Sequence, residues 1–183
     1  SKAYADAIVV YLGFAINRLV DRCSSLCGWD SSRDTIRNVF ARQAIAMTWD
    51  FAEGNPFSSS TGNFSSCLVW IAKVLDAFVP ASGGYEIQHD AQTAPFPPNS
   101  VVSTDPPYYD NIEYADLSDF FYVWARRSFA SIEPKIFSVI STPKAEELVA
   151  TRYRHGGQES ADAFFLEGMR RAVSNMAQQS NPN

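Results

Sequence analysis

Ser103-Thr104-Asp105-Pro106-Pro107-Tyr108-Tyr109 is the stretch that decides the expected fold of this chain. It follows the apolar pair Val101-Val102 and leads into an aromatic-rich run from Ile112 to Trp124. We predict a short buried strand over Val101 to Thr104, with a carboxylate, two prolines and an aromatic ring at its tip. Open α/β sheets bind ligands beyond the C-terminal ends of their strands, so the pattern predicts an α/β fold with a site at Asp105 to Tyr108.

A second strand is predicted just upstream. Gly83-Gly84 is typical of a turn, and Tyr85 to His89 alternates in polarity before Asp90. Ala91 to Ser100 is a proline-bearing connection between the two strands. An acidic residue therefore follows each predicted strand.

The rest of the chain is expected to be mainly helical, with residues 1–80 as a helical region and 81–183 as the region that bears the site. A loop over Glu53 to Asn63 should separate the second helix from the third. Ile136 to Ile140 fits a strand or a loop. The predicted helices cover Tyr4 to Cys27 (ended by Gly28), a segment capped by Ser32 or Asp34 and running to Met47, Ser65 to Phe78, Leu117 to Phe129, a helix begun by Thr142-Pro143, and Ser160 to Met176.

Composition limits the possible functions. With 183 residues and 46% hydrophobic content, the chain can bury a sizeable core as one domain or part of a larger one. A net charge of −5 argues against nucleic-acid binding over the whole surface and leaves room for a local basic patch. Cys23, Cys27 and Cys67 form no disulfide framework, and Cys23-x3-Cys27 lacks a second ligand pair, so we predict a reducing cytoplasm and no metal site.

No membrane segment is predicted. The longest apolar run, Ala7 to Ile16, is too short to span a bilayer, and no secretory signal is visible. The chain begins at Ser1 in a helical pattern, and we expect it to be part of a longer protein.

Asp105-Pro106-Pro107-Tyr108 in this setting resembles the catalytic motif of the amino-methyltransferases, which methylate adenine N6 or cytosine N4 in DNA. Two longer runs, Val101 to Ile112 and Tyr114 to Trp124, are similar to large prokaryotic adenine-specific DNA methylases that carry the DUF1156 domain. Further similar segments are Arg42 to Ala44, Trp49 to Phe57, Thr142 to Leu148 and Tyr153 to Gly157.

The resemblance implies a class I, Rossmann-like methyltransferase fold, present here in part, with S-adenosylmethionine as cofactor and DNA as partner. Asp105, Pro106, Pro107 and Tyr108 match the catalytic motif, and Asp90 stands where such enzymes often place an acidic residue near the cofactor adenine. The carboxylate of Asp105 and the carbonyl of Pro106 would accept hydrogen bonds from the target amine, since proline keeps its C=O. Tyr108 would stack on a base that has been flipped out of the duplex.

Several alternatives stay open. Asp-Pro-Pro-Tyr also occurs as a simple turn, and Asp90 is as consistent with a turn or helix cap as with a cofactor contact. No glycine-rich cofactor loop is recognisable, and we expect it upstream of Ser1. The competing functions are a non-catalytic scaffold that binds DNA or a partner, and a methyltransferase acting on cytosine N4, on RNA or on a protein amide.

Overall fold

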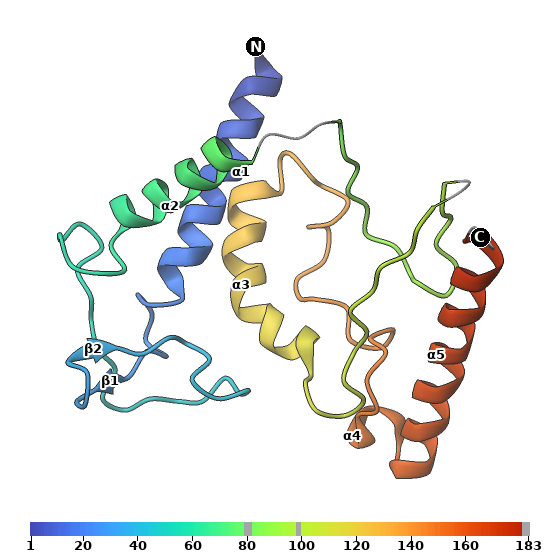
Figure 1. The fold of residues 1–183 in the computed structure, drawn as a ribbon. Helices are drawn as coiled ribbons and strands as arrows, with labels where there is room; N and C mark the ends of the chain where they lie inside the picture. The colour runs from blue at the N-terminus through green and yellow to red at the C-terminus, as the bar shows by residue number, and fades with distance from the viewer. Residues whose placement is uncertain (79–81, 98–99, 181–183) are drawn as a thin grey trace. The chain divides into compact units, whose positions relative to one another are not determined.

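The computed structural model describes residues 1–78, 82–97 and 100–180, and its regular structure is mainly helical (Figure 1). The elements in chain order are α1 (Lys2–Val20), β1 (Trp29–Asp30), β2 (Thr35–Ile36), α2 (Phe64–Ala77), α3 (Tyr114–Phe129), α4 (Arg152–His155) and α5 (Gln158–Gln179). They belong to two compact units, which we call the N-terminal unit (Ser1–Gly83 and Asp116–Thr142) and the C-terminal unit (Gly84–Ala115 and Pro143–Asn183).

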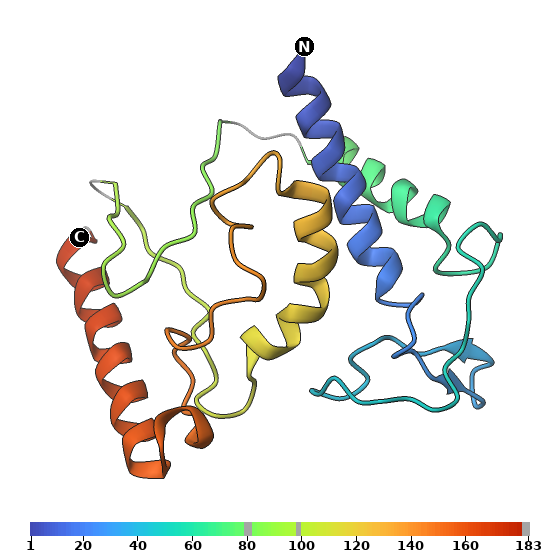
Figure 2. The ribbon, with the colours of Figure 1, turned by 180° about the vertical axis from the view of Figure 1, so that it is seen from behind.

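The N-terminal unit is built on α1, which packs against α2 and contacts α3 through the Phe129 ring; both ribbon views show these helices together (Figures 1 and 2). Gly13 of α1 lies against the ring of Phe129, and the rings of Phe14 and Phe129 meet edge to face at 5.9 Å. Rings from α3 also cover Phe40. These aromatic contacts explain why Asp116–Thr142 joins the N-terminal helices although it lies far from them in sequence.

The first helix was predicted to end at Cys27, which is wrong, and the second predicted helix, from Ser32 or Asp34 to Met47, is not formed. α1 ends at Val20, and an antiparallel hairpin follows, with Trp29 opposite Ile36. Asp30 accepts hydrogen bonds from the Ser32 N–H at 3.0 Å and the Ser32 hydroxyl at 2.6 Å. Ser32, one of the two residues expected to cap a helix, thus stabilises a turn, because short polar side chains compete with helix formation in this way.

Three other predicted helices are confirmed. α2 begins at Phe64, one residue before the predicted start, and Asn63 caps it by accepting from the Ser66 N–H at 2.8 Å. α3 begins three residues earlier than predicted, and α5 extends beyond the predicted helix at both ends. The predicted loop before Asn63 is also present, and residues 136–140 form a loop.

The helix expected from Thr142-Pro143 is absent. The Thr142 N–H and hydroxyl donate to Asp119 at 2.8 and 2.6 Å, and Glu147 accepts from the Ala115 N–H at 2.8 Å. These contacts hold the chain in an irregular path. The short helix α4 follows instead, and Gly156 ends it in the left-handed conformation.

Neither predicted strand forms a ladder within the described residues. Tyr85, Ile87 and Val101 are 100%, 69% and 94% exposed. A strand needs a neighbour to satisfy its backbone N–H and C=O groups, and the sheet in the described part of the chain pairs β1 with β2 and includes neither of these segments. The Rossmann-like sheet therefore stays a prediction.

By length and composition, α1 is apolar enough to cross a membrane. The core helix of a soluble protein or a signal sequence meets the same criterion, so this feature assigns no location, and the absence of a membrane segment stays a prediction.

Candidate functional site

A cavity of about 580 Å³ in the C-terminal unit brings together most of the residues singled out from the sequence. Its wall includes Asp90 from one predicted strand end and Asp105, Pro106 and Pro107 from the other. The size lies within the range of small-molecule sites. The remaining wall is formed by residues 146–148 and by the α5 residues Met169, Ala172, Val173 and Met176.

The Asp90 side of the cavity is fastened to α5. Asn175 Nδ2 donates to the carbonyls of Ala91 at 3.1 Å and Ala94 at 3.0 Å, and Gln179 Nε2 donates to Ala94 at 3.1 Å. Asp90 itself forms a turn, since its Oδ1 accepts from the Gln92 N–H at 2.9 Å. The structure thus shows the turn role of Asp90 directly, while also placing the residue in the cavity wall.

The Asp105 side is fastened through Tyr109, to which sequence reasoning assigned no role. Tyr109 has a positive φ of 59°, its carbonyl accepts from the Ala150 N–H at 3.0 Å, and its ring packs edge to face on Phe165 at 5.2 Å. Its hydroxyl donates to Asp162, and this hydrogen bond raises the pKa of Tyr109. Tyr109 therefore positions the end of the Asp-Pro-Pro-Tyr segment against α5.

A largely buried ion pair supports the third wall. Arg154 Nη1 lies 2.6 Å from Glu147 Oε2, and the two side chains are 10% and 13% exposed. Such a pair contributes to a defined local structure, because removing either partner leaves an uncompensated charge. The segment from Tyr153 to Gly157, which includes most of α4, therefore contributes a largely buried arginine engaged with the cavity wall.

The cavity is apolar on its α5 side and acidic at its edge. Asp90, Asp105, Glu146 and Glu147 contribute carboxylates, and His89 is the basic-type side chain in the wall. The C-terminal unit as a whole contains ten acidic and five basic residues, a net charge of −5, whereas the N-terminal unit contains ten of each. The site thus favours a ligand that combines apolar surface with positive charge.

Tyr108 lies at the edge of this arrangement. Its side chain is 54% exposed, its hydroxyl is 3.4 Å from Asp105 Oδ1, and it is not among the residues that line the cavity. Asp90, Asp105, Pro106 and Pro107 are therefore brought together in one wall, and the Tyr108 ring lies outside it.

Gly156, Gly157 and His155 are not among the residues that line the cavity. Gly156 and Gly157, with φ of 76° and 146°, form the junction between α4 and α5. His155 stacks on Phe164 at 4.1 Å. Among the described residues, no group of three or more His, Cys, Asp or Glu side chains is arranged to hold a metal ion.

No protein-family model, curated protein or solved structure matches this chain.

Proposed function

We propose that this protein is an S-adenosylmethionine-dependent DNA amino-methyltransferase of the cytoplasm, with adenine N6 favoured over cytosine N4. The observation that carries the proposal is the shared cavity, whose wall includes Asp90 together with Asp105, Pro106 and Pro107. The preference for adenine rests on the resemblance to the DUF1156-type methylases.

The chemistry explains why these residue types suit the reaction. An exocyclic amine is a poor nucleophile because its lone pair is delocalised into the ring. The Asp105 carboxylate and the Pro106 carbonyl offer two acceptors for the amine N–H bonds and would turn the lone pair toward the methyl donor. Each proline keeps the preceding residue extended, so the acceptors are held in place before the base arrives.

The cavity also fits the charge of the cofactor. S-adenosylmethionine, when bound, supplies a methyl group on a positively charged sulfonium. Carboxylates of Asp90 and Glu146 would attract this cation, and Met169, Val173 and Met176 offer an apolar surface for its nucleoside part. The glycine-rich loop expected of such enzymes is not recognisable in the sequence, so we expect this chain to bind the cofactor incompletely. Isothermal titration tests that expectation, and micromolar affinity would contradict it.

Asp105→Ala tests the catalytic role. In the full-length protein, transfer of labelled methyl groups from S-adenosylmethionine to DNA should fall by about 10²-fold or more, the usual effect of losing a positioned polar group in the transition state. Asp110→Ala is the matched control, because this exposed carboxylate lies close by in sequence but outside the cavity wall. Undiminished transfer by Asp105→Ala would remove Asp105 from the mechanism.

The second candidate is a non-catalytic scaffold that binds DNA or another partner. It is favoured by the absence of a strand ladder at residues 85–89 and 101–104 in the described chain, since a motif without a supporting sheet is held less rigidly. A full-length wild-type protein that binds DNA and shows no methyl transfer with any DNA, RNA or protein substrate would support the scaffold.

A further inference from the structure

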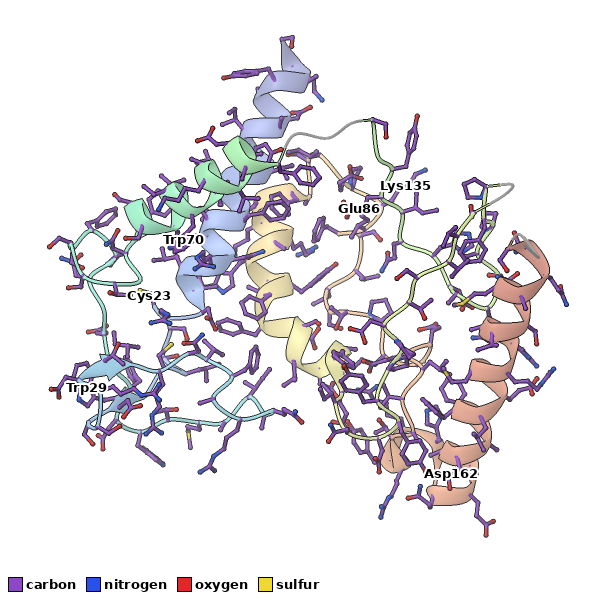
Figure 3. All side chains as sticks on the ribbon, viewed as in Figure 1. Cys23, Trp29, Trp70, Glu86, Lys135 and Asp162 are labelled. Atoms are coloured by element: carbon purple, nitrogen blue, oxygen red, sulfur yellow. The ribbon has the colours of Figure 1, made fainter. Side chains whose placement is uncertain are left out.

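The N-terminal unit carries an exposed tryptophan with two cations beside its ring. The Arg18 guanidinium lies 5.7 Å and the Lys73 ammonium 5.1 Å from the centroid of Trp70, which stays 54% exposed. Trp70 is labelled in Figure 3. The three residues come from α1 and α2, which pack together within this unit. The ring is thus oriented by cation–π contacts while about half of its surface remains open.

Two hollows, of about 480 and 360 Å³, meet at Trp70 and share Ser66. We call them together the Trp70 groove. Lys73 and Phe57, whose ring is 87% exposed, line the first hollow, while Arg18 and Arg22 line the second. Hydroxyl groups of Ser58, Ser59, Ser65, Ser66 and Thr61 complete the walls.

The charge of the groove is positive. Arg18, Arg22 and Lys73 face one acidic side chain, Asp21, whose carboxylate accepts from the Asn38 amide at 2.6 Å. An adjoining hollow of about 440 Å³ contains Asp34 and Glu53 with Arg22, so its balance is acidic and we leave it out of the groove. Cations interleaved with open aromatic faces and hydroxyl donors are the combination by which proteins bind single strands: the cations contact phosphates and the rings stack on bases.

We propose that the Trp70 groove binds a single-stranded nucleic-acid segment, with bases stacked on Trp70 and Phe57 and phosphates held by Arg18, Arg22 and Lys73. This binding is a separate property from the chemistry at Asp105. Its use in presenting an unpaired strand to that site rests on the proposed function. The acidic C-terminal unit would repel a phosphate backbone, and the groove supplies the positive surface that the unit lacks.

The test is binding of a fluorescently labelled oligothymidylate to the full chain, followed by fluorescence anisotropy over a series of salt concentrations. Trp70→Leu should weaken binding about 5- to 150-fold, the effect of losing one base stack. Trp70→Phe should restore most of the affinity because it keeps an aromatic face. Arg18→Gln and Lys73→Gln should each lower the slope of log affinity against log salt by about 0.7.

Matched controls come from the same unit. Trp49 is 84% exposed and Arg42 is exposed, and neither lines the groove, so Trp49→Leu and Arg42→Gln should leave binding unchanged. Unaltered thermal melting of each variant shows that the fold is intact. An oligothymidylate that fails to bind wild type at low salt, or equal losses from Trp70→Leu and Trp49→Leu, would overturn the proposal. The proposal would also be overturned if inorganic polyphosphate competed as well as unlabelled oligothymidylate and Trp70→Leu left the affinity unchanged. That result would show that the groove binds phosphate by charge alone.

The assay uses no cofactor, so it separates this proposal from the proposed function. Strand binding by this chain, with no methyl transfer by the full-length protein, would retain the groove and reject the methyltransferase. Methyl transfer by the full-length protein, with strand binding unaffected by the groove variants, would retain the methyltransferase and reject the groove.

Discussion

Gly13→Ala should destabilise the N-terminal unit, although alanine is the better helix former. A Cβ at position 13 would lie 2.2 Å from both Cε1 and Cζ of Phe129, against about 3.5–4.0 Å for an ordinary carbon contact. The ring has little freedom to move, because Phe129 is 7% exposed and the rings of Phe14 and Phe137 each lie 5.9 Å from it. Either the ring or α1 must therefore shift.

The two opposing terms have known sizes. Replacing glycine by alanine inside a helix favours folding by about 1 kcal/mol. Overpacking a filled core costs about 1–3 kcal/mol, and a shift of more than about 1 Å by a rigid ring places this case at the upper end. The expected net loss is about 2 kcal/mol, which corresponds to a fall in Tm of about 4–8 °C for a chain of this size.

Urea and thermal unfolding, followed by far-ultraviolet circular dichroism, measure the loss. Phe129→Leu removes the ring atoms that collide with the new methyl group, so Gly13→Ala should cost much less in that background, with a coupling energy of about 1–3 kcal/mol. A Gly13→Ala protein as stable as wild type, or additive effects in the double variant, would refute the packing argument and leave helix propensity as the deciding term.

Three further outcomes can be measured. Gly168→Ala places a Cβ 2.3 Å from Leu148 Cδ1, the movable end of a side chain in the cavity wall. The free energy of unfolding in urea should therefore change by less than about 1 kcal/mol. The affinity of the cavity for a ligand, measured by calorimetry, should fall because Leu148 is displaced. Asn63→Ala removes the cap on the Ser66 N–H at 2.8 Å and should cost about 1 kcal/mol of unfolding free energy, with Asn63→Asp as the conservative control. Glu167 accepts hydrogen bonds from two arginines, which lower its pKa from 4.5 to about 2. Its stabilising contribution is present above pH 4.5 and is lost as the pH falls toward 2, so wild type and Glu167→Gln should converge in Tm over that range, and a constant difference would contradict the linkage.

The helices could be predicted where one repeating pattern dominates. In α2, α3 and α5 the apolar residues recur at helical spacing over several turns, so the buried face is evident in the sequence. The predicted helices were wrong at Ser32, whose N–H and hydroxyl donate to Asp30, and at Thr142, whose N–H and hydroxyl donate to Asp119. A cap residue indicates that a polar side chain will bind a nearby N–H, but not which N–H.

The sequence likewise indicated some residues of the candidate site and not others. Asp90 and Asp105 to Pro107 could be predicted as site residues, because their residue types and their positions after the predicted strands can be read from the sequence. Tyr109, Asn175 and Gln179 carried no such signal. Each acts through a partner on a distant segment, such as the hydrogen bond from Asn175 to the carbonyl of Ala91.

By itself, the sequence determined the chemical groups available at the site and the local stiffness around them. The order Asp105-Pro106-Pro107 sets a carboxylate beside a backbone carbonyl in an extended chain, because proline restricts φ and the conformation of the residue before it. Only the tertiary structure decided that Asp90 joins them in one cavity, that Tyr108 lies outside its wall, and that Trp70 gathers Arg18 and Lys73 around its ring. The physical reason is that steric restriction and hydrogen-bonding capacity belong to single residues and their neighbours, whereas burial, ion pairing and cavity shape depend on segments brought together by packing.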